Sequence, residues 1–328
     1  MKNNFDILRL ILSFFVFFAH WNILTVQNMT NGLFHLSGYS VDAFFIVSGF
    51  LIFWSYDNNQ NKKDFYIKRF FRIFPLYGFL ILIQTIFFII YSNGSVIEIV
   101  KYFLSNIIFL NFFSYSVGDL FSHLSINAIN GSLWTLKNEV FFYILVPYIF
   151  ILYKKIGYKF LFFLYIVSVI YMFIIDYIGI AKLLVQFPSQ LRLFIVGILL
   201  YLFFDYIREK MHFVYLLIAI ISIYYFYDSN YFRFTIYPFL LGVLVIYLVY
   251  FIKPIQMSFD FSYSFYILHF PVIQLVLFFD INPSNQIISF ISIFTVILIL
   301  SYFSEKYIEK KFIKLGKNII SRKKNDSN

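Results

Sequence analysis

Long apolar stretches recur along the whole chain, and short polar connections separate them. A membrane-spanning helix needs about 20 predominantly apolar residues, because a helix rises about 1.5 Å per residue and the hydrocarbon core is about 30 Å thick. The pattern therefore predicts an all-α polytopic membrane protein with about ten transmembrane helices. The predicted spans are 5–25, 40–56, 74–92, 133–153, 158–178, 187–204, 212–227, 232–251, 262–280 and 286–304.

The apolar segment 99–115 is ambiguous by length, and the positive charges decide how it is interpreted. Cytoplasmic loops of membrane proteins carry an excess of Lys and Arg. If 99–115 does not cross and the N-terminus is cytoplasmic, most positive charges outside the spans fall on the inner side. These inner charges are Lys62, Lys63, Lys68, Arg69, Arg72, Lys154, Lys155, Lys159, Arg208, Lys210, Lys253 and the tail from Lys306 to Lys324. The outer side keeps Lys101, Lys182 and Arg233.

This charge pattern predicts a multi-pass protein of a bacterial cytoplasmic (inner) membrane with both termini in the cytoplasm. Segment 99–115 is then a re-entrant or interfacial segment on the outer side. Non-helical backbone at that depth must be covered by protein or line a water-filled cavity. We therefore expect a solvated cavity on the outer side.

The composition leaves little room for a soluble domain. The chain is 61% hydrophobic, has a mean hydropathy of +0.81 and is only 13% charged. We expect one transmembrane domain over 1–304 and a basic cytoplasmic tail over 305–328, drawn to anionic membrane lipid. No nucleic-acid partner is expected. The absence of Cys excludes disulfides and thiol catalysis.

The first predicted span carries two ionisable residues, Arg9 and His20. At about 100° per residue, a spacing of eleven returns both side chains to one helix face, roughly 16 Å apart along the axis. Ionisable residues within a membrane helix are costly and mark functional sites. Two simpler interpretations stay open: Arg9 reaches the headgroup region, and His20 bonds a backbone carbonyl near the interface.

Four further polar motifs follow along the chain. They are Gly38-Tyr-Ser-Val-Asp42-Ala-Phe-Phe-Ile-Val-Ser48-Gly49-Phe-Leu-Ile52, Lys68-Arg69-Phe-Phe-Arg72-Ile-Phe-Pro75-Leu-Tyr77, Ser132-Leu-Trp134-Thr-Leu-Lys-Asn-Glu139-Val-Phe-Phe-Tyr143 and Ser262-Tyr263-Ser-Phe-Tyr266-Ile-Leu-His269-Phe-Pro271. With the pair formed by Arg9 and His20, they resemble, in order, the motifs of the acyltransferase 3 family of integral membrane acyltransferases. Ser40, Val140 and Lys68 depart from the usual family residues. No hydrolase-like domain of the SGNH type follows, so we expect the stand-alone form.

The resemblance implies an O-acyltransferase, an enzyme that moves an acyl group, most often acetyl, from acetyl-CoA to a hydroxyl. The implied acceptor is a cell-envelope polysaccharide or a lipid-linked sugar. The chemistry of the residues agrees, because His is a suitable general base and a carboxylate at the same depth can hold its ring. His20, Arg9, Glu139 and Asp42 are the expected catalytic residues. His20, Asp42 and Glu139 are expected to share an outer layer.

The expected donor site lies on the inner side, because coenzyme A thioesters are cytoplasmic and carry several phosphates. Guanidinium groups suit phosphate binding, so Arg69, Arg72, Lys68 and Tyr77 are the candidate cofactor-binding residues. Trp134, His269 and Tyr263 are the candidate substrate-binding residues. No metal-ligand spacing is present, and no metal cofactor is expected.

Each candidate also has a structural interpretation that the sequence leaves open. Lys68, Arg69 and Arg72 are also typical topology anchors. Glu139 has possible ion-pair partners in Arg192 and Lys137.

The same holds for the remaining candidates. Asp42 is a possible N-cap of its span, His269 a possible helix–helix hydrogen bond and Trp134 a possible interface residue. Ser48 and Gly49 predict a close approach of two helices. As a whole, the chain has one alternative function, a transporter or flippase for a lipid-linked sugar or polysaccharide precursor, which would use the same charged stripe.

Overall fold

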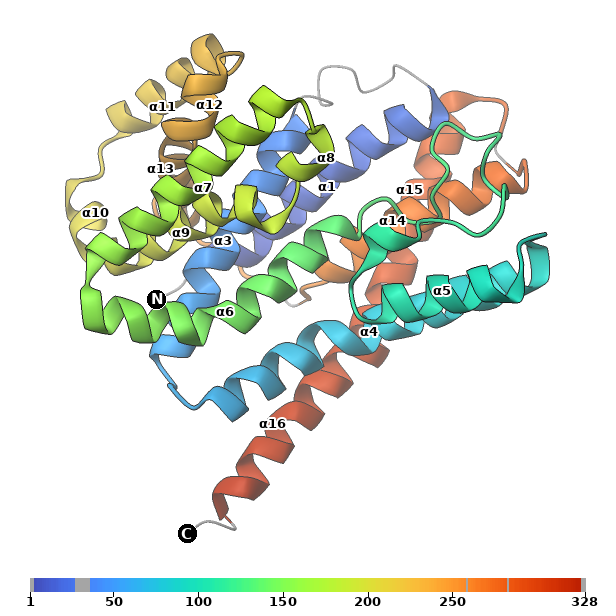
Figure 1. The fold of residues 1–328 in the computed structure, drawn as a ribbon, viewed down its shortest axis with the longest axis horizontal. Coiled ribbons are helices and arrows are strands. Elements are labelled where there is room, and N and C mark those ends of the chain that lie inside the picture. The colour runs from blue at the N-terminus through green and yellow to red at the C-terminus, as the bar shows by residue number, and fades with distance from the viewer. Residues whose placement is uncertain (1–2, 27–35, 258, 282, 326–328) are drawn as a thin grey trace. The chain divides into compact units, whose positions relative to one another are not determined.

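The computed structural model describes residues 3–26, 36–257, 259–281 and 283–325, together with the side chains up to Arg322. Within these ranges the regular structure is helical, which confirms the all-α prediction (Figure 1). The helices are α1 (Phe5–Thr25), α3 (Leu36–Asp57), α4 (Lys62–Tyr91), α5 (Val96–Ile107), η1 (Asn111–Phe113), α6 (Trp134–Ile156), α7 (Tyr158–Ile178), α8 (Ala181–Leu184), α9 (Phe187–Leu202), α10 (Phe204–Lys210), α11 (Phe213–Phe226), α12 (Asn230–Thr235), α13 (Tyr237–Tyr250), α14 (Ser262–Phe278), α15 (Gln286–Ser304), η2 (Glu305–Glu309) and α16 (Lys310–Asn325).

Every predicted span corresponds to a helix. Among the described residues, seven helices are long and apolar enough to cross a membrane. Helices α10 and α11 form a pair bent by 100° that would make an eighth crossing, and the shorter apolar helices α13 and α14 account for the other two predicted spans. The chain is therefore a polytopic membrane protein.

Segment 99–115 contains most of a short helix followed by irregular chain; its re-entrant or interfacial placement stays a prediction. Helix α5 has 12 residues, about 18 Å of helix, which is too short to cross about 30 Å of hydrocarbon. A capping box formed by Ser95 and Glu98 fixes its first turn. The helix runs beside α4 (Figure 1), where Tyr102 donates a hydrogen bond to Gln84 at 2.7 Å.

The irregular chain that follows is partly buried: many of residues 108–127 are exposed, whereas residues 128–130 are buried and side chains bond the backbone nearby. Gln274 of α14 donates to the carbonyls of Ile126 and Ala128 at 2.8 and 2.7 Å. Asn130 donates to the Ile267 carbonyl at 3.0 Å. Side chains thus satisfy the backbone that has no helical partner, as backbone at membrane depth requires. The water-filled cavity stays a prediction.

Helix α4 begins twelve residues before the predicted span 74–92. The side-chain oxygen of Asn61 accepts hydrogen bonds from the amides of Lys63 and Asp64 at 3.0 and 3.2 Å, so the helix starts at the polar segment itself. The basic residues 68–72, predicted to lie in a loop, therefore stand on a helix, because a charged sequence without breakers can extend a helix beyond its apolar part.

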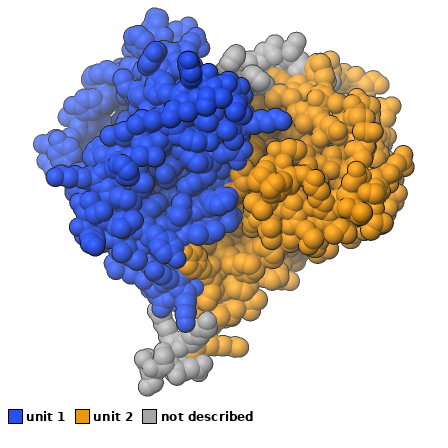
Figure 2. All heavy atoms as spheres, viewed as in Figure 1, with its two compact units in different colours: residues 1–12, 38–65, 138–257 blue, residues 13–37, 66–137, 258–328 orange. Residues whose placement is uncertain are grey.

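The chain forms two compact units, shown in different colours in Figure 2. Unit 1 contains residues 1–12, 38–65 and 138–257, and unit 2 contains residues 13–37, 66–137 and 258–328. Helix α1 contributes its first turns to unit 1 and its remainder to unit 2.

In unit 1, helices α3 and α9 approach each other at two glycines. A Cβ atom on Gly49 would lie 2.2 Å from the Phe194 carbonyl oxygen, and one on Gly197 would lie 2.1 Å from the Ile46 carbonyl oxygen. Backbone cannot move aside as a side chain can, so only glycine fits here. The close approach predicted from Ser48 and Gly49 is confirmed, and it is typical of membrane helices with small residues at their interface.

We predict that Gly197→Ala lowers the free energy of unfolding by about 1–3 kcal/mol, because the added methyl group forces the two backbones apart. Gly38→Ala, on the exposed start of α3, is the control: among the described residues its Cβ would meet only the Tyr227 hydroxyl, at 3.6 Å. This control should leave the protein unchanged or slightly more stable. Unfolding by SDS titration in mixed micelles measures both. Equal stabilities of the two variants would contradict the close contact.

Candidate active site

The two histidines singled out in the sequence form a hydrogen-bonded pair in unit 2. Nδ1 of His20, on α1, lies 2.7 Å from Nε2 of His269, on α14. The ring planes are 18° apart and the ring centroids 5.0 Å. This centroid separation is about the N···N distance plus the two ring radii, so the rings meet edge to edge along the hydrogen bond. His269 thus makes the helix–helix hydrogen bond that was one of its two interpretations.

Aromatic side chains surround the histidine pair. Phe17, Phe265 and Phe270 are almost completely buried in one cluster, and the Phe270 ring lies edge-on to His20 with centroids 5.0 Å apart. Gly131 makes room for Phe270, because a Cβ there would lie 2.6 Å from the ring. The pair therefore stands in apolar surroundings, where hydrogen bonds are electrostatically strong and unpaired polar groups are costly.

Glu139 is held by hydroxyl groups in unit 1. Ser48 of α3 donates to its Oε1 at 3.5 Å, and Tyr143, one turn further along α6, donates to the same oxygen. The predicted alternative partners have other contacts: the Lys137 ammonium lies 4.7 Å from the centre of the Phe112 ring, and Arg192 donates to the Ser189 carbonyl at 3.3 Å. Glu139 is partly exposed.

Asp42 lies inside α3 rather than at its start. The helix begins at Leu36, so the N-cap interpretation is wrong; the residues before Asp42 extend the helix by more than a turn. Tyr237 of α13 donates to Asp42 Oδ2 at 3.0 Å. Arg192 and Arg233 are close enough to attract this carboxylate electrostatically.

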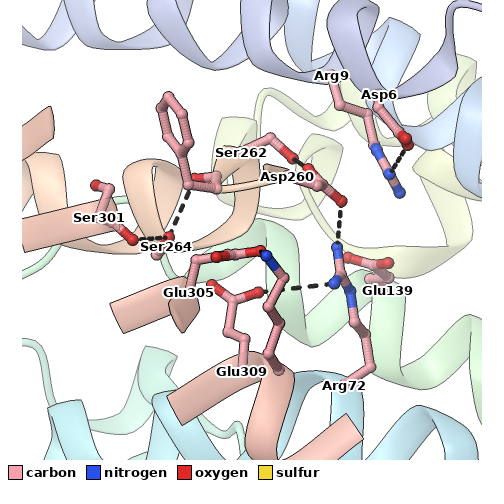
Figure 3. Close-up of polar contacts among 12 residues, drawn as sticks. Asp6, Arg9, Arg72, Glu139, Asp260, Ser262, Ser264, Ser301, Glu305 and Glu309 are labelled. Atoms are coloured by element: carbon pink, nitrogen blue, oxygen red, sulfur yellow. Dashed lines mark hydrogen bonds and ion pairs between the residues drawn. The ribbon is translucent and has the colours of Figure 1, made fainter. Parts of the chain in front are cut away.

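Of the four predicted catalytic residues, Arg9, Asp42 and Glu139 belong to unit 1 and His20 belongs to unit 2. Arg9 pairs with Asp6 at 2.5 Å, one turn earlier on α1, with the Asp6 side chain 57% exposed (Figure 3). The layer predicted for His20, Asp42 and Glu139 stays a prediction.

Arg72 lies between two acidic side chains. Its Nη2 lies 2.9 Å from Asp260 Oδ2, and its Nη1 lies 3.7 Å from Glu309 Oε2 (Figure 3). Ser262 donates to the other oxygen of Asp260 at 2.7 Å. The Glu309 side chain is only 1% exposed, and a carboxylate so deeply buried needs a cation or strong donors. Neither acidic partner is among the residues predicted from the sequence.

A sequence signal for one of these partners, Glu309, exists. Glu305 and Glu309 are four residues apart and directly follow the apolar run of α15, so they share a helix face near a membrane boundary. Glu305 is also buried and pairs with Lys310 at 2.8 Å. Two carboxylates on one face of a helix that continues from a span indicate a cation on a neighbouring helix.

Of the other candidate residues, the two tyrosines are bonded to backbone carbonyls within unit 2. Tyr77 is fully buried and donates to the Asn106 carbonyl at 2.6 Å. Tyr263 donates to the Ile73 carbonyl at 2.8 Å. Lys68, Arg69 and Trp134 are partly exposed, the first two on α4 and the third at the start of α6. No group of three or more metal-ligating side chains occurs among the described residues.

Comparison with known proteins gives the family. A family model described as "Acyltransferase domain", that of acyltransferase 3, matches residues 2–305. This match confirms the resemblance inferred from the five motifs.

Two curated relatives match part of the chain. One is "Nodulation protein 10" of Rhizobium leguminosarum bv. viciae, 31% identical over 159 residues, which are 44% of this chain and 43% of that protein. The other is an "O-acetyl transferase" of Shigella phage Sf6, 34% identical over 152 residues, 44% of each chain. The match spans less than half the length of each relative. No solved structure matches.

We predict that Arg72→Met lowers the free energy of unfolding by about 1–3 kcal/mol, because it leaves the Glu309 carboxylate buried without its cation. Asp6→Asn, which removes one partner of an exposed pair, should change it by less than about 1 kcal/mol. The double variant with Arg72→Met and Glu309→Met should recover part of the loss. SDS titration in mixed micelles compares the three. An Arg72→Met protein as stable as Asp6→Asn would contradict the pairing.

Proposed function

This chain belongs to the acyltransferase 3 family, and we propose that it transfers an acyl group, acetyl in the first place, from a cytoplasmic acyl-CoA to a hydroxyl of a cell-envelope polysaccharide or a lipid-linked sugar. The observation that carries the proposal is the His20–His269 pair, which gives a family motif residue an imidazole partner in an apolar site. The relative described as an O-acetyl transferase supports acetyl as the group.

The chemistry follows from the histidine. His20 takes the proton of the acceptor hydroxyl as the oxygen attacks the thioester carbonyl carbon. The new C–O bond forms, the C–S bond breaks, and the coenzyme A thiolate leaves. The proton held by His20 then goes to that thiolate. Arg9, eleven residues earlier on the same helix, is roughly 16 Å away along the axis, so we assign its positive charge to the donor phosphates rather than to the reacting carbonyl.

Donor binding is assigned to the basic residues of α4. Lys68 and Arg69 are partly exposed on α4, and we propose that they provide most of the attraction for the phosphates of coenzyme A. Arg72 with its acidic partners then fixes this part of α4. Glu139 and Asp42, each bonded by hydroxyl groups, are proposed to bind the acceptor or to adjust the charge near the histidine.

We predict that His20→Ala abolishes acylation. Envelope glycans from cells with the intact protein should show a mass increment of one acetyl group per repeat that is missing from cells without the protein and from cells with His20→Ala. The matched control is His212→Ala, which changes a histidine just before α11 and should keep the increment. Mass spectrometry of the isolated glycans gives the readout.

If the increment persists in His20→Ala, His20 is not the general base, but the protein is still an acyltransferase. No acyl difference on any glycan, with a lipid-linked intermediate accumulating inside the cell, would favour the transporter or flippase instead.

We also propose the orientation indicated by the charges, with both termini in the cytoplasm of a bacterial inner membrane. The chain has no Cys, so single cysteines can report it. Lys182→Cys, exposed on α8, should react with a membrane-impermeant maleimide in intact spheroplasts. Lys155→Cys, exposed at the end of α6, should react only after the membrane is opened. The reverse labelling pattern would contradict the proposed orientation and indicate the opposite one.

A further inference from the structure

We propose that His269 is a positioning residue that holds His20 in the tautomer with the proton on Nδ1, so that Nε2 of His20 carries the lone pair that accepts the substrate proton. The inference rests on the proposed function for the substrate, but the tautomer itself follows from the geometry of unit 2. It gives His269 a role in place of substrate binding.

The first step is the proton on His269. Its Nδ1 lies 3.2 Å from the backbone carbonyl oxygen of Phe265, one turn earlier on α14. A carbonyl oxygen can only accept a hydrogen bond, so this contact requires a hydrogen on Nδ1. In a neutral imidazole the other nitrogen, Nε2, is then an acceptor.

The second step determines which ring nitrogen of His20 carries the hydrogen. Nε2 of His269 faces Nδ1 of His20 at 2.7 Å. Because His269 supplies the lone pair, His20 must supply the hydrogen, and its Nδ1 is the donor. The near-coplanar rings place that hydrogen in the plane of the accepting lone pair, which is the favoured direction. The Nε2 atom of His20 is left unprotonated.

The reverse polarity would need His269 to be an imidazolium that donates from both nitrogens. His269 is fully buried and its neighbours Phe17, Phe265 and Tyr266 are aromatic. In the described part of the chain its hydrogen-bond partners are His20 and the backbone carbonyls of Phe265 and Tyr266, none of them a carboxylate. A buried cation in such surroundings is costly, so the neutral form is favoured.

The accessibility of the two rings fits this division. His269 is fully buried, whereas His20 is partly exposed. The His269 ring therefore cannot contact a substrate, whereas the His20 ring can. A chain of two hydrogen bonds, from a backbone carbonyl through His269 to His20, orients the base in the way that a buried carboxylate does in a hydrolase triad.

The experiment reads the tautomer directly. Protein labelled with ¹⁵N in its five histidines is reconstituted in nanodiscs at pH 7.5, and the ring nitrogen shifts distinguish protonated from unprotonated nitrogens. His20→Ala and His269→Phe assign the two residues. We expect both rings to be neutral with the proton on Nδ1, and His20 to lose this signature in His269→Phe. A wild-type His20 protonated on Nε2 would overturn the proposal.

Kinetics with acetyl-CoA and the acceptor glycan provide the second arm. His269→Phe keeps the ring volume but has no acceptor, whereas His269→Gln places an amide oxygen near the position of Nε2. We expect kcat to fall about 10–100-fold in His269→Phe with the KM for acetyl-CoA unchanged, and His269→Gln to recover most of it. A purely packing role predicts the opposite order, because Phe fills the site better.

The two arms separate this inference from the proposed function. If His20→Ala is inactive and both His269 variants match the wild type, the acyltransferase stands and the positioning role of His269 is overturned. If the NMR signature is as expected and no variant or wild-type protein transfers acetyl, the hydrogen-bond polarity is supported and the function proposed for it fails.

Discussion

The structure depends on one constraint: a polar group placed among apolar helices must find a partner within the protein, because the surroundings offer none. The His20–His269 pair is the plainest case, since each imidazole satisfies the other. Gln274 does the same for two backbone carbonyls of the irregular chain after α5. Asn4 does it at the end of α13, where its amide nitrogen donates to the Ile252 carbonyl and its oxygen accepts from Ile255.

The same constraint separates groups that hold the fold from groups that are available for chemistry. Tyr77 and Tyr263 have hydroxyls that are bonded to backbone carbonyls, so their polar atoms support the packing of α4. Arg72 is pinned between Asp260 and Glu309. His20 differs, because one nitrogen is occupied by a partner that is itself fixed while the ring stays partly exposed. A group oriented on one side and accessible on the other is suited to moving a proton.

The role proposed for His20 also illustrates how a neutral partner can hold a base in an apolar site. A carboxylate next to His20 would itself need to be kept charged in an apolar site, which is costly. A neutral histidine whose own proton is bonded to a helix carbonyl avoids that cost and still fixes the ring. Under the proposal the orienting role falls to His269, and Glu139, with two hydroxyl donors, is left to bind the acceptor or to adjust the charge near the histidine.

The sequence by itself determined the fold class and the family, and it indicated the polar motifs from which the site is proposed. Apolar runs of span length impose helices, and the spacing of Arg9 and His20 places them on one face of α1, because both properties depend only on local geometry. The prediction was wrong about the start of α4, because polar chain without helix breakers extends this helix back to Lys62. In the same way α3 begins at Leu36, so Asp42 lies inside the helix and not at its start.

The tertiary structure decided which residues meet. Nothing local to α1 indicates that His20 faces a histidine 249 positions away. Nor does the motif around Arg72 indicate that Asp260 and Glu309 are its partners. A hydrogen bond depends on a few ångströms and on the direction of a lone pair. Helix packing fixes both, and in unit 1 that packing is permitted by the absence of side chains at Gly49 and Gly197. Composition and spacing specify the chemical groups that are present, and the packing of the helices specifies which of them are paired.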